Sequence, residues 1–187
     1  MKKALAVVSF IALLSAFGAT ASAHRIDEYL QAARLAIAPD RITLEMDLTP
    51  GVDVAPLIFA LINTNHDGMI SEAEARSYAG QLLKEIVLDL DGHPQRLSLV
   101  RAQFPSFREM SEGVGTIRIE AAAVCASGPG QHVLFYQNNH RNDISVYLVN
   151  ALLPASRNIE ITGQRRDPLQ RGIQLSFTVM NAGFSPR

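Results

Sequence analysis

Apolar and polar residues alternate along most of this chain with a period of two. In segment 41–48, Ile42, Leu44, Met46 and Leu48 alternate with charged or hydroxyl side chains. This pattern is typical of a β-strand with one face in a core and the other in water. It returns in residues 86–90, 97–99, 117–121, 133–135, 144–148, 159–161 and 173–179. The chain is therefore predicted to be mainly β, as an antiparallel β-sandwich of about eight or nine short strands.

Residues 53–83 interrupt this alternation with helical spacing. Segment 54–62 is apolar nearly all round, with Asp53 as a candidate N-cap and Pro56 allowed in the first turn. A second amphipathic helix is indicated by apolar residues that recur at helical intervals, namely Ala75, Tyr78, Ala79, Leu82 and Leu83. We predict a helix-loop-helix insertion between the second and third strands of the sandwich.

The segment between the two predicted helices, residues 63–74, carries oxygen ligands at regular positions. Gly68 stands at the sixth position, where the loop must reverse with a positive φ, and Ile70 at the eighth is the apolar residue that anchors the loop to a core. This layout resembles an EF-hand calcium loop. Its candidate metal ligands are Asn63, Asn65, Asp67, the Met69 carbonyl, Ser71 through a water, and Glu74.

The loop departs from the usual pattern at its first position, where Asn63 replaces the expected Asp. Only Asp67 and Glu74 then supply formal charge, so we predict one weak Ca²⁺ site with a dissociation constant on the order of 10⁻⁴–10⁻³ M. A second interpretation needs no metal, because Ser71-x-x-Glu74 is also a capping box and Asn/Asp/Gly clusters form turns. His66 occupies the variable fourth position and is not expected to be a ligand.

A shorter motif, Asp89-x-Asp91-Gly92, resembles the start of another calcium loop. Pro94 follows at once, no acidic residue closes the loop, and the flanking residues alternate as strands do. We therefore predict a β-hairpin turn at 91–92 and a single, unpaired EF-hand.

The N-terminus has the three parts of a secretory signal. Lys2 and Lys3 precede an apolar run at residues 4–17, and Ala21-Ser22-Ala23 forms a small-residue cleavage site. We predict a signal peptide at 1–23 and a single mature domain at 24–187, placed in the periplasm or outside the cell. No later segment has the roughly 18 continuous apolar residues of a membrane helix.

Composition and the absence of known motifs argue against several classes of function. A net charge of −1 with scattered arginines argues against nucleic acid as a partner. The single cysteine, Cys125, allows no intrachain disulfide and is expected to be a buried, inert thiol. The sequence holds no G-x-S-x-G, no H-E-x-x-H and no phosphate-binding glycine loop, so we do not expect an enzyme.

The order of several short motifs is similar to that of a known family. They are A-H-R-I-D-E-Y-L at 23–30, D-L-T-P-G-V at 47–52, L-D-G at 90–92, E-G-x-G-T-I-R-I at 112–119, I-S-V-Y-L-V-N-A-L-L-P at 144–154 and Q-R-R-D-P-L-Q at 164–170. Together they resemble the extracytoplasmic N-terminal region of HupE/UreJ-type membrane proteins. Members of that family are associated with transport of nickel or other metals through a membrane domain of several helices, which this chain lacks. The resemblance implies a stand-alone periplasmic module acting beside a separate membrane protein.

That context gives a second metal hypothesis. His24 would become the mature N-terminus, where the terminal amine and the imidazole can together chelate Cu²⁺ or Ni²⁺. The sequence thus predicts an exported calcium-binding module in which Ca²⁺ is mainly structural. The alternative function is that of an accessory protein that handles nickel or copper for a HupE/UreJ-like transporter and binds the metal through its own His24. The sequence gives no oligomeric state.

Overall fold

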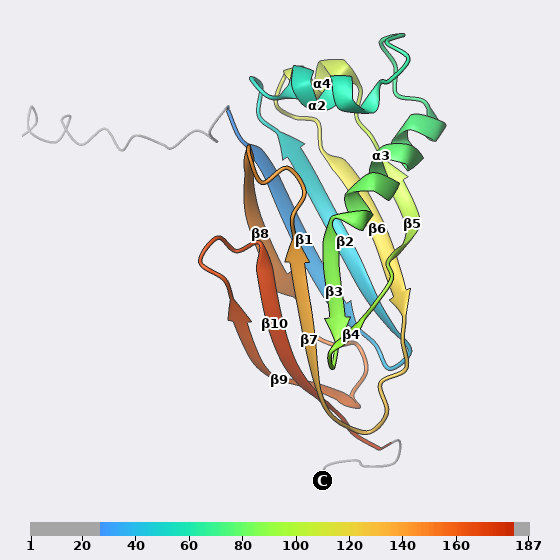
Figure 1. Ribbon diagram of the computed structural model, residues 1–187, viewed down its shortest axis with the longest axis vertical. Helices are drawn as coiled ribbons and strands as arrows, with labels where there is room; N and C mark the ends of the chain where they lie inside the picture. Colours follow the sequence, from blue (N-terminus) through green and yellow to red (C-terminus); the bar gives the residue numbers. More distant parts are fainter. Residues whose placement is uncertain (1–26, 182–187) are drawn as a thin grey trace, which may run out of the picture.

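A computed structural model describes residues 27–181 of the chain (Figure 1). The predicted signal peptide at 1–23 and the candidate ligand His24 lie outside these residues. Within 27–181, none of the helices has the length and apolar character that crossing a bilayer requires.

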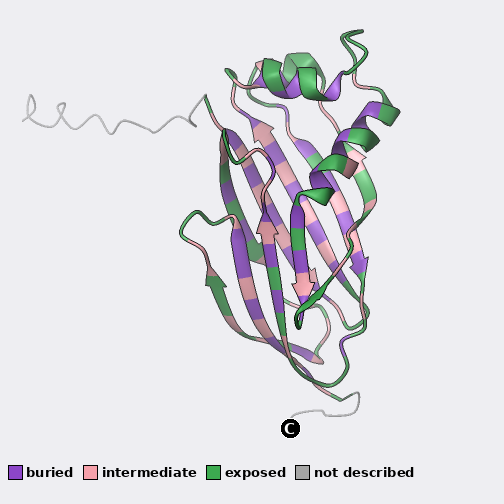
Figure 2. Cartoon of the chain, in the orientation of Figure 1, coloured by how far each residue is buried: buried purple, intermediate pink, exposed green. Residues whose placement is uncertain are grey.

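Two five-stranded sheets pack face to face, and the core lies between them (Figures 1 and 2). The first sheet has the order β5-β6-β2-β1-β8, and the second has the order β4-β3-β7-β10-β9. The first comprises β1 (Tyr29–Ile37), β2 (Arg41–Pro50), β5 (Ser98–Gln103), β6 (Ile117–Val124) and β8 (Ser145–Ala151). The second comprises β3 (Ile86–Leu90), β4 (His93–Pro94), β7 (Gly130–Asn138), β9 (Ile159–Arg166) and β10 (Gly172–Val179). The prediction of a mainly β protein that folds as a sandwich of two sheets is confirmed.

The apolar residues that alternate with polar ones in the sequence are the buried residues of the strands, and the polar residues between them are more exposed. Ile42, Leu44, Met46 and Leu48 of β2 are all buried, while the residues between them are partly exposed. Because successive side chains of a strand point to opposite faces, the apolar set of each strand enters the core together. One pairing departs from the predicted antiparallel arrangement, since β1 and β8 pair in parallel.

The predicted hairpin turn at 91–92 is present, but its second strand is short. Asp91 and Gly92 have φ of 55° and 82°, as a two-residue hairpin turn with the twist of its strands requires. Strand β4 covers only His93–Pro94, because Pro94 has no N–H to extend the ladder. The chain then leaves this sheet, and β5 pairs with β6 of the other sheet.

Two helices, α2 (Ala55–Ile62) and α3 (Glu72–Lys84), lie between β2 and β3 in the chain. Helix α2 buries Ala55, Ile58, Phe59 and Ile62, and α3 buries a stripe that includes Tyr78, Ala79 and Leu82. Asp53 is not the N-cap of α2, as the sequence suggested. The N-cap is Val54, which has no side-chain oxygen to accept a hydrogen bond.

A short helix that the sequence did not predict, α4 (Phe107–Ser111), begins at a capping box formed by Ser106 and Glu109. The ring of Phe107 lies 4.6 Å from that of Phe59 in α2, measured between centroids. Helices α2 and α4 therefore share one end of the sandwich, while α3 runs from that end along β5 and β3 (Figure 1).

Candidate functional site

The loop at 63–74 is bounded by helix ends on both sides. Asn63 is the C-cap of α2 and donates its backbone N–H to the Phe59 carbonyl at 2.8 Å, and Ser71 is the N-cap of α3. The backbone reverses through positive φ at His66 (60°) and Gly68 (84°). The reversal predicted at Gly68 is therefore present. Ile70 packs against the core as predicted, and His66 is exposed.

Short-range hydrogen bonds hold the middle of the loop. Asn65 Oδ1 accepts the backbone N–H of Asp67 at 3.1 Å, and Asp67 Oδ1 accepts that of Met69 at 2.8 Å. The Asn65 amide also donates to Asp67 Oδ2 at 3.0 Å. These contacts place the two candidate ligand side chains, Asn65 and Asp67, beside each other.

The closing residue, Glu74, is buried and hydrogen-bonded at both carboxylate oxygens. Its Oε1 accepts the backbone N–H groups of Thr64 (2.8 Å) and Asn65 (3.2 Å), while Oε2 accepts the N–H (3.0 Å) and hydroxyl (2.8 Å) of Ser71. The hydrogen bonds from Ser71, followed by those from Asn65 and Thr64, lower the pKa of Glu74 to about 2. Glu74 is thus an ionised carboxylate that joins the two ends of the loop.

Asn63, at the first loop position, differs from the other candidate ligands. The residue is only 4% exposed, and its side-chain oxygen Oδ1 is buried with no hydrogen-bond partner. A buried polar atom without a partner costs free energy, and such atoms are few in folded proteins. A cation at the loop would give this oxygen a partner.

The loop's donor set fits a hard cation. It consists of amide, carboxylate, carbonyl and hydroxyl oxygens, which are the ligands of Ca²⁺. Residues 27–181 contain no group of three or more His, Cys, Asp or Glu side chains placed to hold a metal. The capping box of the alternative interpretation is also formed, between Ser71 and Glu74. An ion would compete with the hydrogen bonds that Glu74 already makes.

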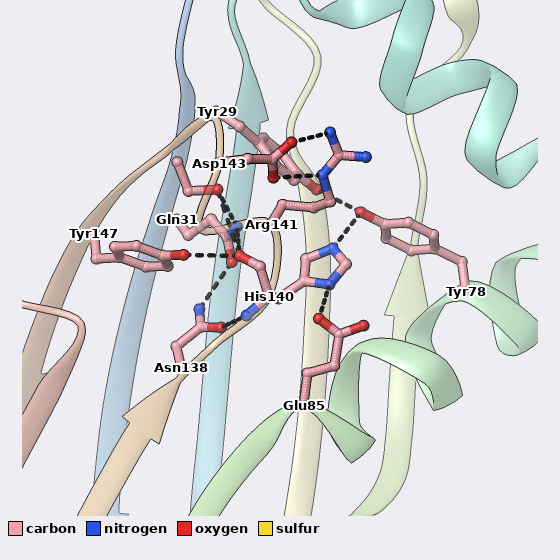
Figure 3. Close-up of polar contacts among 10 residues, drawn as sticks. Tyr29, Gln31, Tyr78, Glu85, Asn138, His140, Arg141, Asp143 and Tyr147 are labelled. Carbon is pink, nitrogen blue, oxygen red and sulfur yellow. Dashed lines mark hydrogen bonds and ion pairs between the residues drawn. The ribbon is translucent and has the colours of Figure 1, made fainter.

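A second polar cluster, which the sequence did not reveal, lies around the buried His140 (Figure 3). His140 Nδ1 is 3.0 Å from Glu85 Oε2, and Nε2 is 2.9 Å from the Tyr78 hydroxyl. The Tyr78 hydroxyl is 3.0 Å from that of Tyr29. Burial lowers the pKa of His140, and it raises the pKa of Tyr78 to about 12. A neutral His140 therefore donates from Nδ1 to Glu85 and accepts at Nε2 from Tyr78.

The backbone of His140, like its ring, makes several hydrogen bonds. Its carbonyl accepts from the Gln31 amide at 2.9 Å and the Tyr147 hydroxyl at 2.9 Å, and its N–H donates to Asn138 Oδ1 at 2.9 Å. The Asn138 amide in turn donates to Gln31 Oε1 at 2.8 Å. This cluster joins α3, β1, β7 and β8. Two of its members, Asn138 and His140, come from the Asn-rich run 137–142.

Within residues 27–181, the other histidines and the cysteine do not form a shared site. His132 Nδ1 lies 2.7 Å from Asp91 Oδ2 and its Nε2 lies 2.7 Å from the Gly128 carbonyl, so His132 and His140 have separate partners. His93 is exposed. Cys125 is partly buried, and burial raises the pKa of its thiol, which disfavours the reactive thiolate.

Comparisons of the chain with protein-family models, with curated proteins and with solved structures find no match.

Proposed function

We propose that residues 63–74 bind one Ca²⁺ weakly and that the ion serves as a structural brace in an exported protein. The unpartnered Oδ1 of Asn63 carries this proposal, because it stands where the first ligand of an EF-hand-like loop is required. The other ligands would be Asn65, Asp67, the Met69 carbonyl, Ser71 through a water, and Glu74.

The ion would join the end of α2 to the start of α3. Asn63 is the C-cap that follows the first helix, and Glu74 lies in the first turn of the second. When bound, Ca²⁺ supplies positive charge to two carboxylates and a partner to the buried amide oxygen. The hydrogen bonds from Thr64 and Asn65 to Glu74 would have to loosen, which supports weak rather than tight binding.

A weak site suits a compartment with abundant calcium, consistent with the signal-like N-terminus. Occupancy stabilises the folded protein by RT ln(1 + [L]/Kd), which is about 0.4–1.4 kcal/mol when the calcium concentration is roughly 1–10 times Kd. We therefore propose a periplasmic or extracellular module in which the metal supports the fold.

Isothermal calorimetry of the purified protein with Ca²⁺ tests the proposal. We expect one binding event in the wild type and none in Glu74→Gln, because the amide removes the charge and the bidentate closing ligand. Gln at this position still completes a capping box, so the variant should fold. Glu72→Gln is the matched control, since Glu72 is exposed in the same helical turn and pairs with Arg76.

The proposal fails if calcium gives neither heat nor a thermal shift up to about 10 mM, well above the weak end of known sites. Residues 63–74 would then be a turn held by the capping box alone. The alternative of Cu²⁺ or Ni²⁺ binding at His24, beside a HupE/UreJ-like membrane protein, rests on sequence only. Titrating those two metals under the same conditions, with and without one residue added before His24, tests it separately.

A further inference from the structure

A groove of about 630 Å³ lies between the C-terminal end of α3 and residues 94–99, which lead from β4 into β5. Both segments stand on the same side of the sandwich, where each sheet has an edge strand (Figure 1). Sites for small molecules have volumes of about 300–1,000 Å³, so the groove has room for such a ligand. Its ten lining residues are too few for an interface with a folded protein, which takes about 20–30 residues from each partner.

The floor of the groove is aliphatic. Leu83 and Ile86 are each 9% exposed, while Leu97 and Leu99 are partly buried and pack against the core. None of the ten lining residues is aromatic or acidic. The groove therefore offers no ring for a nucleobase to stack on and no carboxylate for a metal ion. Its floor suits a hydrocarbon chain, which gains free energy by leaving water for an apolar surface.

Gly80 leaves the α3 side of the groove open. This residue lies inside the helix without a positive φ, and a Cβ added to it would meet no atom within 4 Å. Glycine inside a helix is less favourable than alanine, so helix formation does not explain its presence. A larger side chain at this position would enter the groove that Gly80 lines.

Two cations without partners also line the groove. Lys84 and Arg96 are exposed, and within residues 27–181 neither side chain makes an ion pair or a hydrogen bond. Most of the other Lys and Arg side chains in this range have such a partner. The neighbouring carboxylate of Glu85 lies 3.0 Å from the ring of His140 instead. The groove thus combines an aliphatic floor with positive charge that no acidic side chain offsets.

We propose that this groove binds a long-chain aliphatic carboxylate. The hydrocarbon chain lies along the leucine and isoleucine side chains between α3 and residues 94–99, and the carboxylate pairs with Lys84 and Arg96. The groove shares no residue with the loop at 63–74, so calcium is not required for this binding.

Calorimetric titration of the purified protein with dodecanoate, below the concentration at which it forms micelles, tests this proposal. EDTA is present, so that the result does not depend on the calcium site. We expect one binding event with dodecanoate and none with acetate, which lacks the chain. Dodecyltrimethylammonium carries the same chain on a cationic head group and should bind about tenfold more weakly or worse, because both cations repel it.

Variants show whether the bound chain occupies the groove. Gly80→Leu should abolish dodecanoate binding, and Gln81→Leu is its matched control because Gln81 is exposed on the same helix and does not line the groove. Lys84→Gln combined with Arg96→Gln should weaken binding about 3–30-fold. Arg157→Gln should not weaken it, although Arg157 is likewise exposed and unpaired among the described residues. These charge variants keep the test decisive if Gly80→Leu does not fold.

The proposal is overturned if dodecanoate gives no heat, if Gly80→Leu folds and binds as the wild type does, or if the charge variants bind unchanged. Equal affinity for dodecyltrimethylammonium would overturn it as well, since it would mean apolar adsorption alone. If a hexapeptide of alternating Leu and Glu binds and dodecanoate does not, the groove belongs to an extended protein segment and the proposal is wrong.

Discussion

His132 has a hydrogen-bond acceptor at each ring nitrogen. The Asp91 carboxylate and the Gly128 carbonyl lie 2.7 Å from Nδ1 and Nε2, so both nitrogens must carry protons for both bonds to form. The hydrogen bond to Asp91, aided by that to Gly128, raises the pKa of His132. The ring also stacks on Phe177. The charged imidazolium thus ties the β3–β4 turn to β7.

This raised pKa predicts a dependence of stability on pH. The contribution of His132 is fully present below its unfolded pKa, near 6.5, and is lost as pH rises through the higher folded pKa. Because the Asp91 side chain is partly exposed, we expect a loss of only about 0.5–1 kcal/mol. Urea unfolding between pH 6 and 9 should show this loss in the wild type and not in His132→Gln.

His93→Gln is the control for that series, because His93 is exposed on the same hairpin. It should retain the wild-type dependence on pH. A wild-type profile that is flat from pH 6 to 9 would show that His132 is not charged in the folded protein.

Residues that act through their neighbours in sequence could be predicted, and those that act across the fold could not. Gly68, Ile70 and Glu74 stand at fixed offsets within one loop, so the sequence located them. His140 meets Glu85 and Tyr78 across sequence separations of 55 and 62 residues, and no local pattern records those contacts. Whether Asn63 Oδ1 has a hydrogen-bond partner depends on the folded surroundings, so the sequence could not show that it lacks one.

Helix α3 carries a glycine that its structure does not need. A Cβ added to Gly80 would meet no atom within 4 Å, and Gly80 has no positive φ. Glycine inside a helix costs conformational entropy relative to alanine. We expect Gly80→Ala to raise the free energy of unfolding by about 0.5–1 kcal/mol in chemical denaturation.

Gly115, after α4, provides the opposite case for comparison. A Cβ there would lie 2.7 Å from the backbone nitrogen of Met110, so Gly115→Ala should lower the free energy of unfolding by more than about 1 kcal/mol. If Gly80→Ala also lowers the free energy of unfolding, the space beside α3 is filled and the expected gain in stability is contradicted.

Alternation predicted most strands but not their partners. Alternation indicates which face of a strand is buried. It does not indicate which strands pair, so the parallel pairing of β1 with β8 could not be predicted from it. Strand β1 itself has weaker alternation, because Gln31 occupies a fully buried position. That glutamine is retained in the core by its hydrogen bonds to His140 and Asn138. The short helix α4 has too few residues for a helical period to show.

The His140 cluster connects the two sheets and α3. Tyr78→Phe would remove the hydroxyl that bonds both His140 Nε2 and the Tyr29 hydroxyl. Because this leaves buried polar atoms without a partner, we expect the free energy of unfolding to fall by about 1–2 kcal/mol. Urea denaturation measures the change.

Tyr136→Phe is the matched control for this hydroxyl. Tyr136 is fully buried, and its hydroxyl has no hydrogen-bond partner. Its removal should change the free energy of unfolding by less than about 0.5 kcal/mol, or increase it. Equal losses in the two variants would mean that the cluster around His140 gives no more stability than an isolated buried hydroxyl.

The parallel pair β1–β8 also constrains the order in which the chain can fold. Strand β1 lies between β2 and β8, so one of its edges has no partner until Ser145–Ala151 has been synthesised. An unpaired strand edge readily joins other chains, and distant pairings form slowly. A ribosome must therefore release most of this chain before its first sheet is complete, and until then the free edge of β1 is open to pairing with other chains.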